Sequence, residues 1–171
     1  FESNPSLQNQ QQALLEFVVI NSNTTTMKIV VTGANGQLGK CMHDVSVEFP
    51  QHQFIFLGRE HFALEQFGMV KTVLHTLQPD VVINAAAYTA VDKAEQESDL
   101  AFLINGEAVG HLASVCNALN IRLIHISTDY VFDGTKTTPY VETDAVNPIG
   151  VYGKSKLLGE QLIAENNNEA I

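Results

Sequence analysis

The feature that most constrains the fold is a short apolar run that ends at a glycine-rich loop. Residues 28–32 (KIVVT) are mostly β-branched, as is typical of a buried parallel strand, and residues 33–39 (GANGQLG) follow directly. Glycines at such a turn let the chain reverse tightly, let the backbone approach a pyrophosphate and let the next helix pack on the strand. The loop therefore predicts a dinucleotide site. Its G-x-x-G-x-x-G spacing differs from the common G-x-G-x-x-G, and a purely structural turn is the alternative.

Beyond this loop, apolar strand patterns alternate with helical patterns. We expect further strands at residues 54–57, 80–84 and 121–126, and helices at residues 36–48, 66–77, 98–119 and 150–165. Strands that alternate with helices form βαβ units, whose parallel sheet is covered by helices on both faces. The sequence therefore predicts an α/β fold with a doubly wound, Rossmann-like parallel sheet.

Length and composition limit the class of protein. The 171 residues indicate one domain, and a net charge of −10 with nine basic residues argues against a nucleic-acid partner, which needs basic clusters. The two cysteines, Cys41 and Cys116, lack metal-ligand spacing and indicate buried or half-buried thiols in a reducing compartment. The longest apolar stretch near the N-terminus, residues 17–20, is far shorter than a membrane span of roughly 20 residues. We therefore expect a cytoplasmic protein with no membrane segment and no metal site.

The composition of the chain changes at Met27. Residues 1–26 are rich in Ser, Asn and Gln, which predicts an extension: a tag remnant, the tail of a fused upstream domain or a natural arm. Within it, residues 7–20 have the pattern of a short helix that carries no chemistry. We assign residues 27–171 to one NAD(P)-binding Rossmann domain.

Cofactor choice depends on the residues that follow the second expected strand. An NAD site usually places an acidic side chain there to bind the ribose 2′-hydroxyl, whereas this chain has Gly58, Arg59 and Glu60. The guanidinium of Arg59 can pair with a 2′-phosphate, which favours NADP. The alternatives are that Glu60 binds the ribose of NAD and that Arg59 is an ordinary solvated charge.

A Tyr-x-x-x-Lys motif opens the last expected helix. Tyr152 and Lys156 lie on one helix face, where the ammonium can lower the pKa of the phenol to the range that a general acid needs. Thr128 follows the fourth expected strand, at the edge of a parallel sheet where ligands bind. We therefore expect Tyr152 to give a proton to a substrate carbonyl and Thr128 to donate a hydroxyl to it. A nicotinamide would supply hydride, and Lys156 would also bind its ribose.

Four stretches of the chain carry a resemblance to a known family. They are residues 32–39 (TGANGQLG), 80–95 (DVVINAAAYTAVDKAE), 127–134 (STDYVFDG) and 147–160 (NPIGVYGKSKLLGE). On these motifs the chain resembles the extended short-chain dehydrogenase/reductase family, and within it the dTDP-4-dehydrorhamnose reductases. The resemblance implies NAD(P)H-dependent reduction of the 4-keto group of a dTDP-linked 6-deoxy-keto-sugar, from dTDP-4-dehydro-L-rhamnose to dTDP-L-rhamnose. It also implies a possible homodimer, because relatives often dimerise.

The resemblance implies roles for individual residues as well. The implied catalytic trio is Thr128, Tyr152 and Lys156. Together with Arg59 from the argument above, the expected cofactor-binding residues are Gly33, Gly36, Gln37, Leu38, Gly39, Ala85, Ala86, Ala87, Tyr152 and Lys156. The implied substrate-binding residues are Thr89, Thr128, Asp129 and Tyr130.

The sequence departs from the family pattern in two places. Members often carry an Asp-Leu or Asp-Ile pair that faces the adenine, and here the matching place holds Ala63 and Leu64, so that contact is in doubt. Family chains also continue well beyond the Tyr-x-x-x-Lys helix. We therefore expect a truncated Rossmann-like domain that lacks the smaller C-terminal substrate domain and cannot close a sugar-nucleotide site alone.

The residues alone leave two other functions possible, and they predict the positions of several further side chains. A nucleotide-sugar epimerase or dehydratase of the same fold would keep NAD tightly bound, whereas a non-catalytic, cofactor-sensing regulatory subunit would not need the trio. His125 is expected to be a satisfied core or interface histidine, and His111 a surface or helix-interface residue. Phe62 and Phe67 are expected to be core residues, and residues 92–97 a solvated helix start.

Overall fold

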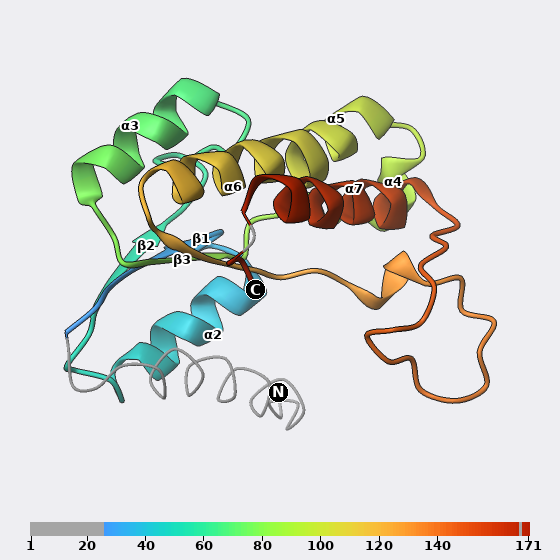
Figure 1. The fold of residues 1–171 in the computed structure, drawn as a ribbon, viewed down its shortest axis with the longest axis horizontal. Helices are drawn as coiled ribbons and strands as arrows, with labels where there is room; N and C mark the ends of the chain where they lie inside the picture. The colour runs from blue at the N-terminus through green and yellow to red at the C-terminus, as the bar shows by residue number, and fades with distance from the viewer. Residues whose placement is uncertain (1–25, 168) are drawn as a thin grey trace.

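The centre of the fold is a parallel sheet (Figure 1). The computed structural model describes residues 26–167 and 169–171, so the predicted extension, with its expected helix at residues 7–20, lies outside the described residues except for Thr26. Within the described residues the sheet has four strands in the spatial order β2-β1-β3-β4. They are β1 Lys28–Thr32, β2 Gln53–Leu57, β3 Val81–Asn84 and β4 Arg122–His125. The prediction of an α/β fold with a parallel sheet is confirmed.

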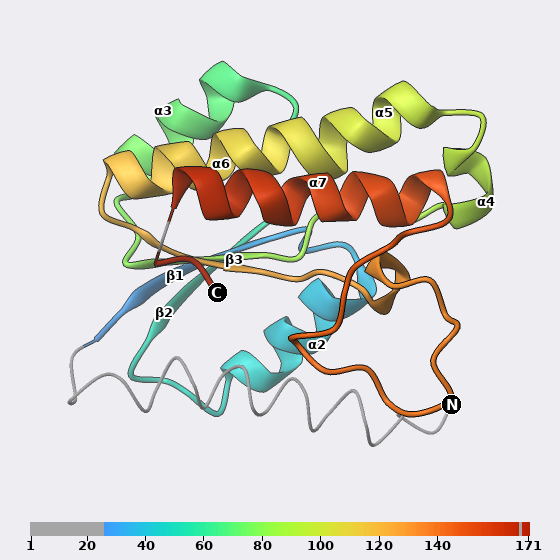
Figure 2. The same cartoon turned by 45° about the vertical axis from the view of Figure 1, so that its right-hand side comes forward.

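Helices cover both faces of this sheet. Among the described residues the α-helices are α2 Gln37–Ser46, α3 Phe67–Leu77, α4 Val91–Ala94, α5 Ser98–Phe102, α6 Ala108–Ala118 and α7 Val151–Asn166. Helix α2 lies on one face, and α3, α6 and α7 lie on the other (Figure 1). Figure 2 shows α6 and α7 side by side above the strands. The arrangement is the doubly wound one that the sequence predicts.

Both faces of the sheet are buried under helices, and successive side chains of each strand pack against opposite faces. Val30 and Val82 are fully buried in one cluster with apolar residues of α3 and α6. Val31 and Ile83, the next residues along the same strands, are fully buried in a second cluster with Met42 of α2. The uninterrupted apolar runs in the sequence follow from this double covering.

The single long helix expected at residues 98–119 is interrupted. A π-turn at Leu103–Glu107 joins α5 to α6. The turn carries the buried Asn105, whose amide accepts from the Tyr88 N–H at 2.8 Å and donates to the Tyr88 carbonyl at 3.0 Å. A π-turn is a local bulge within an otherwise helical pattern, so the apolar spacing that predicted the helix does not reveal it.

The expected core position of Phe67 is wrong. Phe62 is buried, with 2% of its surface exposed, but Phe67 begins α3 and is 38% exposed. The Phe67 ring stacks on His111 with ring centroids 4.6 Å apart, and His111 Nε2 lies 3.1 Å from the Phe67 carbonyl oxygen. His111 therefore lies between α3 and α6, as expected for a helix-interface residue.

Both cysteines are free thiols, Cys41 half-buried and Cys116 buried, as expected. Burial raises the pKa of the Cys116 thiol to about 12. Within residues 26–167 and 169–171, no cluster of three or more His, Cys, Asp or Glu side chains is placed to hold a metal ion. None of the described helices combines the length and apolar character that a membrane crossing needs.

Candidate active site

A cavity of about 1280 Å³ lies at the carboxyl ends of the strands, the edge at which open parallel sheets bind ligands. Ile171 also lines it, because the Ile171 N–H donates to the Leu123 carbonyl at 3.0 Å and so pairs the last described residue with β4. The sequence-predicted site residues that line the cavity are Gly33, Gly36, Gln37, Leu38, Arg59, Ala85, Ala86, Ala87, Thr89, Thr128, Tyr152 and Lys156. Gly39, Asp129 and Tyr130 are described residues that do not line it.

Two glycines of the loop are required by close packing. Gly33 has a left-handed φ of +68°, and a Cβ there would lie 2.7 Å from the Ala85 carbonyl carbon. A Cβ on Gly39 would lie 2.4 Å from the Gly33 oxygen. Because glycine has no Cβ, the loop can pass close to the end of β3 and α2 can start directly against it.

The third glycine opens α2 toward the cavity. Gly36 is the N-cap of this helix and makes no side-chain cap, and the first-turn residues Gln37 and Leu38 line the cavity. N–H groups in the first turn of a helix have no carbonyl partner within the helix. Together with the positive end of the helix dipole, these donors suit an anionic group. The residues present therefore fit the pyrophosphate of a dinucleotide.

Arg59 lies just after β2, on the cavity wall, and its charge is paired. The guanidinium donates to the Glu65 carboxylate, while 67% of the Arg59 side chain stays exposed. Glu60, the alternative ribose ligand, accepts from the Asn35 amide at 3.2 Å. Residues 63–64, an alanine and a leucine, are buried at 5% and 2% exposure and offer only apolar side chains near an adenine.

The three predicted catalytic residues line this cavity from two elements. Thr128 caps a 3₁₀ turn (η2, Asp129–Val131), and its hydroxyl accepts from the Tyr130 N–H at 3.3 Å. Tyr152 lies in the first turn of α7 with its ring edge-on to Tyr130, the centroids 5.5 Å apart, and Lys156 follows one turn later. Among the described residues no hydrogen bond joins the side chains of the trio to one another. The structure brings them to one cavity without linking them directly.

Lys156 is almost completely buried, with 2% of its surface exposed. Its Nζ donates to the Ile126 carbonyl at 2.6 Å and lies 3.2 Å from His125 Nε2. Burial lowers the pKa of Lys156 to about 8, against the opposing effect of the Glu160 carboxylate. Burial and, second, the Lys156 charge lower the pKa of His125 to about 3, so this imidazole is neutral at physiological pH.

Several buried polar side chains beside the trio were not predicted from the sequence. Thr32, Asn84, Asn105 and Ser155 are fully buried, and Asn105 Nδ2 donates to Ser155 Oγ at 3.0 Å. Thr32 ends β1 and Asn84 ends β3, at the sheet edge that carries the cavity. The signal that could have found these two is a polar residue that closes an otherwise apolar strand.

Comparison with known proteins agrees with this geometry. The family model described as the RmlD substrate binding domain matches residues 27–171. The chain belongs to this family. The resemblance to dTDP-4-dehydrorhamnose reductases that the four motifs carry is thereby confirmed.

Curated relatives align with most of this RmlD-family chain. A dTDP-4-dehydrorhamnose reductase from Burkholderia thailandensis is 46% identical over 144 residues, which cover 84% of this chain and 47% of the relative. Another from Sinorhizobium fredii is 43% identical over 141 residues, which cover 82% of this chain and 47% of the relative. The chain therefore spans about half the length of the curated relatives it matches.

Solved structures of similar proteins share the fold. The dTDP-4-dehydrorhamnose reductase of Bacillus anthracis, in complex with NADP, has a TM-score of 0.82 at 35% identity, covering 87% of this chain and 53% of that one. The corresponding protein of Clostridium acetobutylicum has a TM-score of 0.81 at 39% identity, covering 84% of this chain and 51% of that one.

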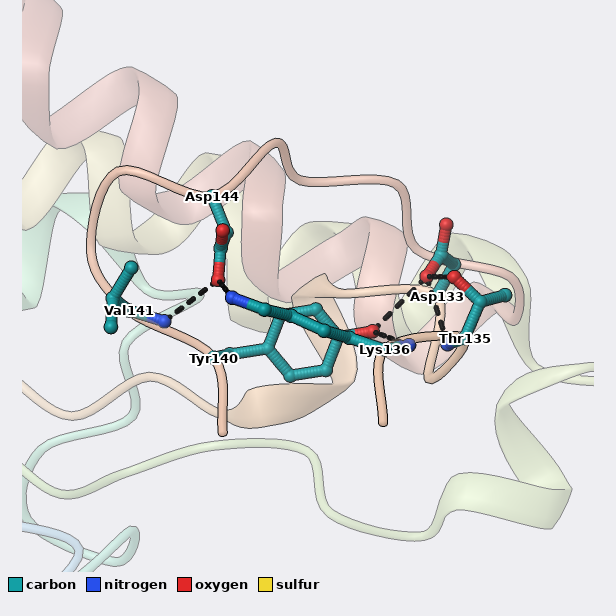
Figure 3. Close-up of polar contacts among 6 residues, drawn as sticks. All are labelled: Asp133, Thr135, Lys136, Tyr140, Val141 and Asp144. Atoms are coloured by element: carbon teal, nitrogen blue, oxygen red, sulfur yellow. Dashed lines mark hydrogen bonds and ion pairs between the residues drawn. The ribbon is translucent and has the colours of Figure 1, made fainter. Parts of the chain in front are cut away.

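In this RmlD-family chain, the loop between η2 and α7 is held by its own polar contacts (Figure 3). Asp133 accepts from the Thr135 N–H at 3.0 Å, the Thr135 hydroxyl at 2.7 Å and the Tyr140 hydroxyl at 3.1 Å. Lys136 forms an ion pair with Asp144. The hydrogen bonds to Asp133, those from Thr135 first, lower its pKa to about 2. The loop thus has a defined conformation where it leads into α7.

Proposed function

We propose that this protein is an NADPH-dependent reductase that converts the 4-keto group of dTDP-4-dehydro-L-rhamnose to the alcohol of dTDP-L-rhamnose. The observation that carries the proposal is that Thr128, Tyr152 and Lys156 line the same cavity as the first turn of α2. Membership of the RmlD family supports the substrate, since relatives with 46% and 43% identity are dTDP-4-dehydrorhamnose reductases.

The cofactor is held by the glycine loop and the rim of the cavity. The N–H groups of Gln37 and Leu38 bind its pyrophosphate, and residues 85–87 line its path toward Tyr152. Arg59 pairs with the 2′-phosphate, which favours NADPH over NADH. The NADP complex of the Bacillus anthracis relative supports this choice. When bound, the nicotinamide supplies a hydride to the substrate.

Tyr152 supplies the proton. Its phenol donates to the keto oxygen of the sugar, and the Thr128 hydroxyl donates a hydrogen bond to the same oxygen. Lys156 carries a positive charge below its pKa of about 8 and stabilises the phenolate that Tyr152 becomes. Lys156 also binds the ribose next to the nicotinamide.

The sugar nucleotide and the context of the chain complete the proposal. Thr89, Asp129 and Tyr130 bind the substrate near Thr128, and a smaller C-terminal domain of a longer protein closes the site over the sugar nucleotide. Residues 27–171 form the cofactor-binding domain, and residues 1–26 form an extension. The enzyme acts in the cytoplasm as a homodimer, and its net charge of −10 opposes nucleic-acid binding.

The test is an assay of the full-length protein with dTDP-4-dehydro-L-rhamnose, followed by the loss of NADPH absorbance. Tyr152→Phe removes the proton donor and is expected to lower kcat by about 10²–10⁴-fold, while NADPH binding measured by calorimetry is retained. Tyr140→Phe is the matched control, because it removes a phenol hydroxyl outside the cavity.

Two results would redirect the proposal. Unchanged function in Tyr152→Phe would contradict the catalytic role and favour a cofactor-sensing regulatory subunit. Release of tightly bound NAD when the purified protein is denatured would favour a nucleotide-sugar epimerase or dehydratase of the same fold.

A further inference from the structure

A row of polar side chains crosses the sheet beside the cavity. Thr32, Asn84 and His125 are the last residues of β1, β3 and β4, and the strand register pairs Thr32 with Asn84 and Asn84 with His125. Thr32 Oγ1 donates to Asn84 Oδ1 at 2.6 Å, and Asn84 Nδ2 lies 2.9 Å from His125 Nδ1. Side chains of paired residues in neighbouring strands point to the same face, which makes the row continuous.

The row ends on Lys156. His125 Nε2 lies 3.2 Å from Lys156 Nζ, which also donates to the Ile126 carbonyl at 2.6 Å. Thr32 and Asn84 are 0% exposed and Lys156 is 2% exposed. Buried polar groups need internal partners, and the members of the row supply them to one another.

The orientation of the Asn84 amide fixes which nitrogen of His125 carries the proton. The Ala86 N–H, which can only donate, lies 3.2 Å from the Asn84 oxygen, so the amide nitrogen faces His125. An amide nitrogen also only donates, so His125 Nδ1 accepts and the neutral ring has its proton on Nε2. That N–H faces the nitrogen of Lys156.

We propose that His125 is a positioning residue for Lys156: Asn84 holds its ring in the Nε2–H tautomer, and this N–H can donate only to the amine form of Lys156 and so disfavours the ammonium. The contact between His125 and Lys156 and the tautomer of His125 do not depend on the proposed function, whereas their effect on catalysis rests on it. Neither Asn84 nor His125 lines the cavity. They act by setting the position of Lys156 and the pH range over which it is charged beside Tyr152.

The groups around Lys156 act in opposite directions. Burial disfavours the ammonium, whereas the carboxylate of Glu160, one turn along α7, favours it. The Nε2–H of His125, from β4, faces the same nitrogen at 3.2 Å and adds to the effect of burial. The titratable side chains placed around Lys156 are His125 from β4, Glu160 on α7 and Tyr152, one turn before Lys156 on the same helix. With a pKa of about 8, Lys156 is charged below that pH and neutral above it. His125 stays neutral because burial and, second, the Lys156 charge lower its pKa to about 3.

The direct test is the protonation state of the His125 ring, read by NMR of the protein labelled with ¹⁵N-histidine. A His125→Gln variant assigns the signal among the six histidines of the chain. The proposal predicts a neutral ring with the proton on Nε2 between about pH 5 and 8. A proton on Nδ1, or a ring that becomes a cation above about pH 5, overturns it. No cofactor or substrate is needed, so the result is independent of the reductase proposal.

Asn84→Asp reverses the row and gives a second, kinetic test. A carboxylate accepts from Nδ1–H, which turns Nε2 into an acceptor and favours the ammonium of Lys156. The basic limb of the kcat–pH profile of the full-length enzyme is then expected to move up by about one unit. Thr32→Val is the matched control, because Ala86 still holds the Asn84 amide and the limb is expected to stay in place.

The possible failures are distinguishable. Superimposable pH profiles of the wild type and of an Asn84→Asp variant that circular dichroism shows to be folded overturn the role of His125. Absence of reductase activity in the wild type overturns the proposed function, while the ring tautomer still decides the contact with Lys156. If Asn84→Asp does not fold, the histidine NMR of the wild type decides the matter.

Discussion

The two ends of the cavity offer a ligand different kinds of groups. At the glycine end they are backbone N–H groups of the first turn of α2, and the side chains matter mainly by being absent. At the lysine end they are side chains, and Lys156 is 2% exposed at the end of a hydrogen-bonded row. Backbone donors keep their geometry as long as the helix holds, whereas the row depends on the orientation of the Asn84 amide and the tautomer of His125. Substitutions should therefore act by steric clash at the glycine end and by changing protonation states at the lysine end.

The largest effect on folding is expected at Gly33. An alanine Cβ would lie 2.7 Å from the Ala85 carbonyl carbon at a φ of +68°. Gly33→Ala should therefore lower the free energy of unfolding by about 1–3 kcal/mol and weaken NADPH binding. Gly68→Ala is the matched control, since its Cβ meets nothing within 4 Å on α3, and it should raise stability by about 0.5–1 kcal/mol. Urea unfolding measures the free energy of unfolding of both variants. Equal values would contradict the steric requirement for glycine at position 33.

A smaller effect is expected at the cavity wall, where Arg59 pairs with Glu65. Arg59→Ala should weaken NADPH binding by about 10- to 100-fold, because hydrogen bonds to a charged group contribute about 1.5–3 kcal/mol. NADH binding should change little. Glu65→Gln keeps the length of the side chain and removes the competing charge, so NADPH should bind more tightly. Calorimetric titrations measure these affinities, and equal losses of NADPH and NADH binding in Arg59→Ala would contradict a 2′-phosphate contact.

The smallest effect is expected outside the cavity, at Asp133. Hydrogen bonds lower the pKa of this half-buried carboxyl from 3.8 to about 2, so their stabilising effect is present above pH 3.8 and is lost as the pH falls through about 2. Asp133→Ala should speed protease cleavage of the loop at neutral pH and leave global unfolding almost unchanged. Glu142→Ala, in the same loop, is the control. Cleavage of Asp133→Ala at the control's rate would show that these hydrogen bonds do not hold the loop.

How far the sequence predicts the molecule differs between the same two ends. The glycine end is predictable because its requirements are local: residues 28–39 contain the strand, the turn and the helix start. The lysine end is only partly predictable. The spacing of Tyr152 and Lys156 places both on one helix face, but the partner of Lys156 is His125, which lies 31 residues away in the chain. The sequence indicates that His125 has hydrogen-bond partners, and only the fold shows that they are Asn84 and Lys156.

Two further differences between the predicted and the observed structure also arise from contacts that are distant in sequence. Hydrophobicity alone places Phe67 in the core, yet its exposure depends on how the start of α3 meets α6, where His111 covers one side of the ring. The π-turn at Leu103–Glu107 carries Asn105, which bonds to the backbone of Tyr88, 17 residues away in the chain. In both cases the deciding contact joins elements that the local pattern does not connect.

The central claim is that both ends of the cavity bind one ligand. Backbone amide NMR spectra, recorded while the ¹⁵N-labelled protein is titrated with NADPH, test this most directly. If one ligand spans both ends, the amides of Gln37 and Leu38 and those of Thr128 and Lys156 are expected to shift along one saturation curve with a single Kd. Shifts confined to the glycine end, or none in a protein shown to be folded, would contradict it.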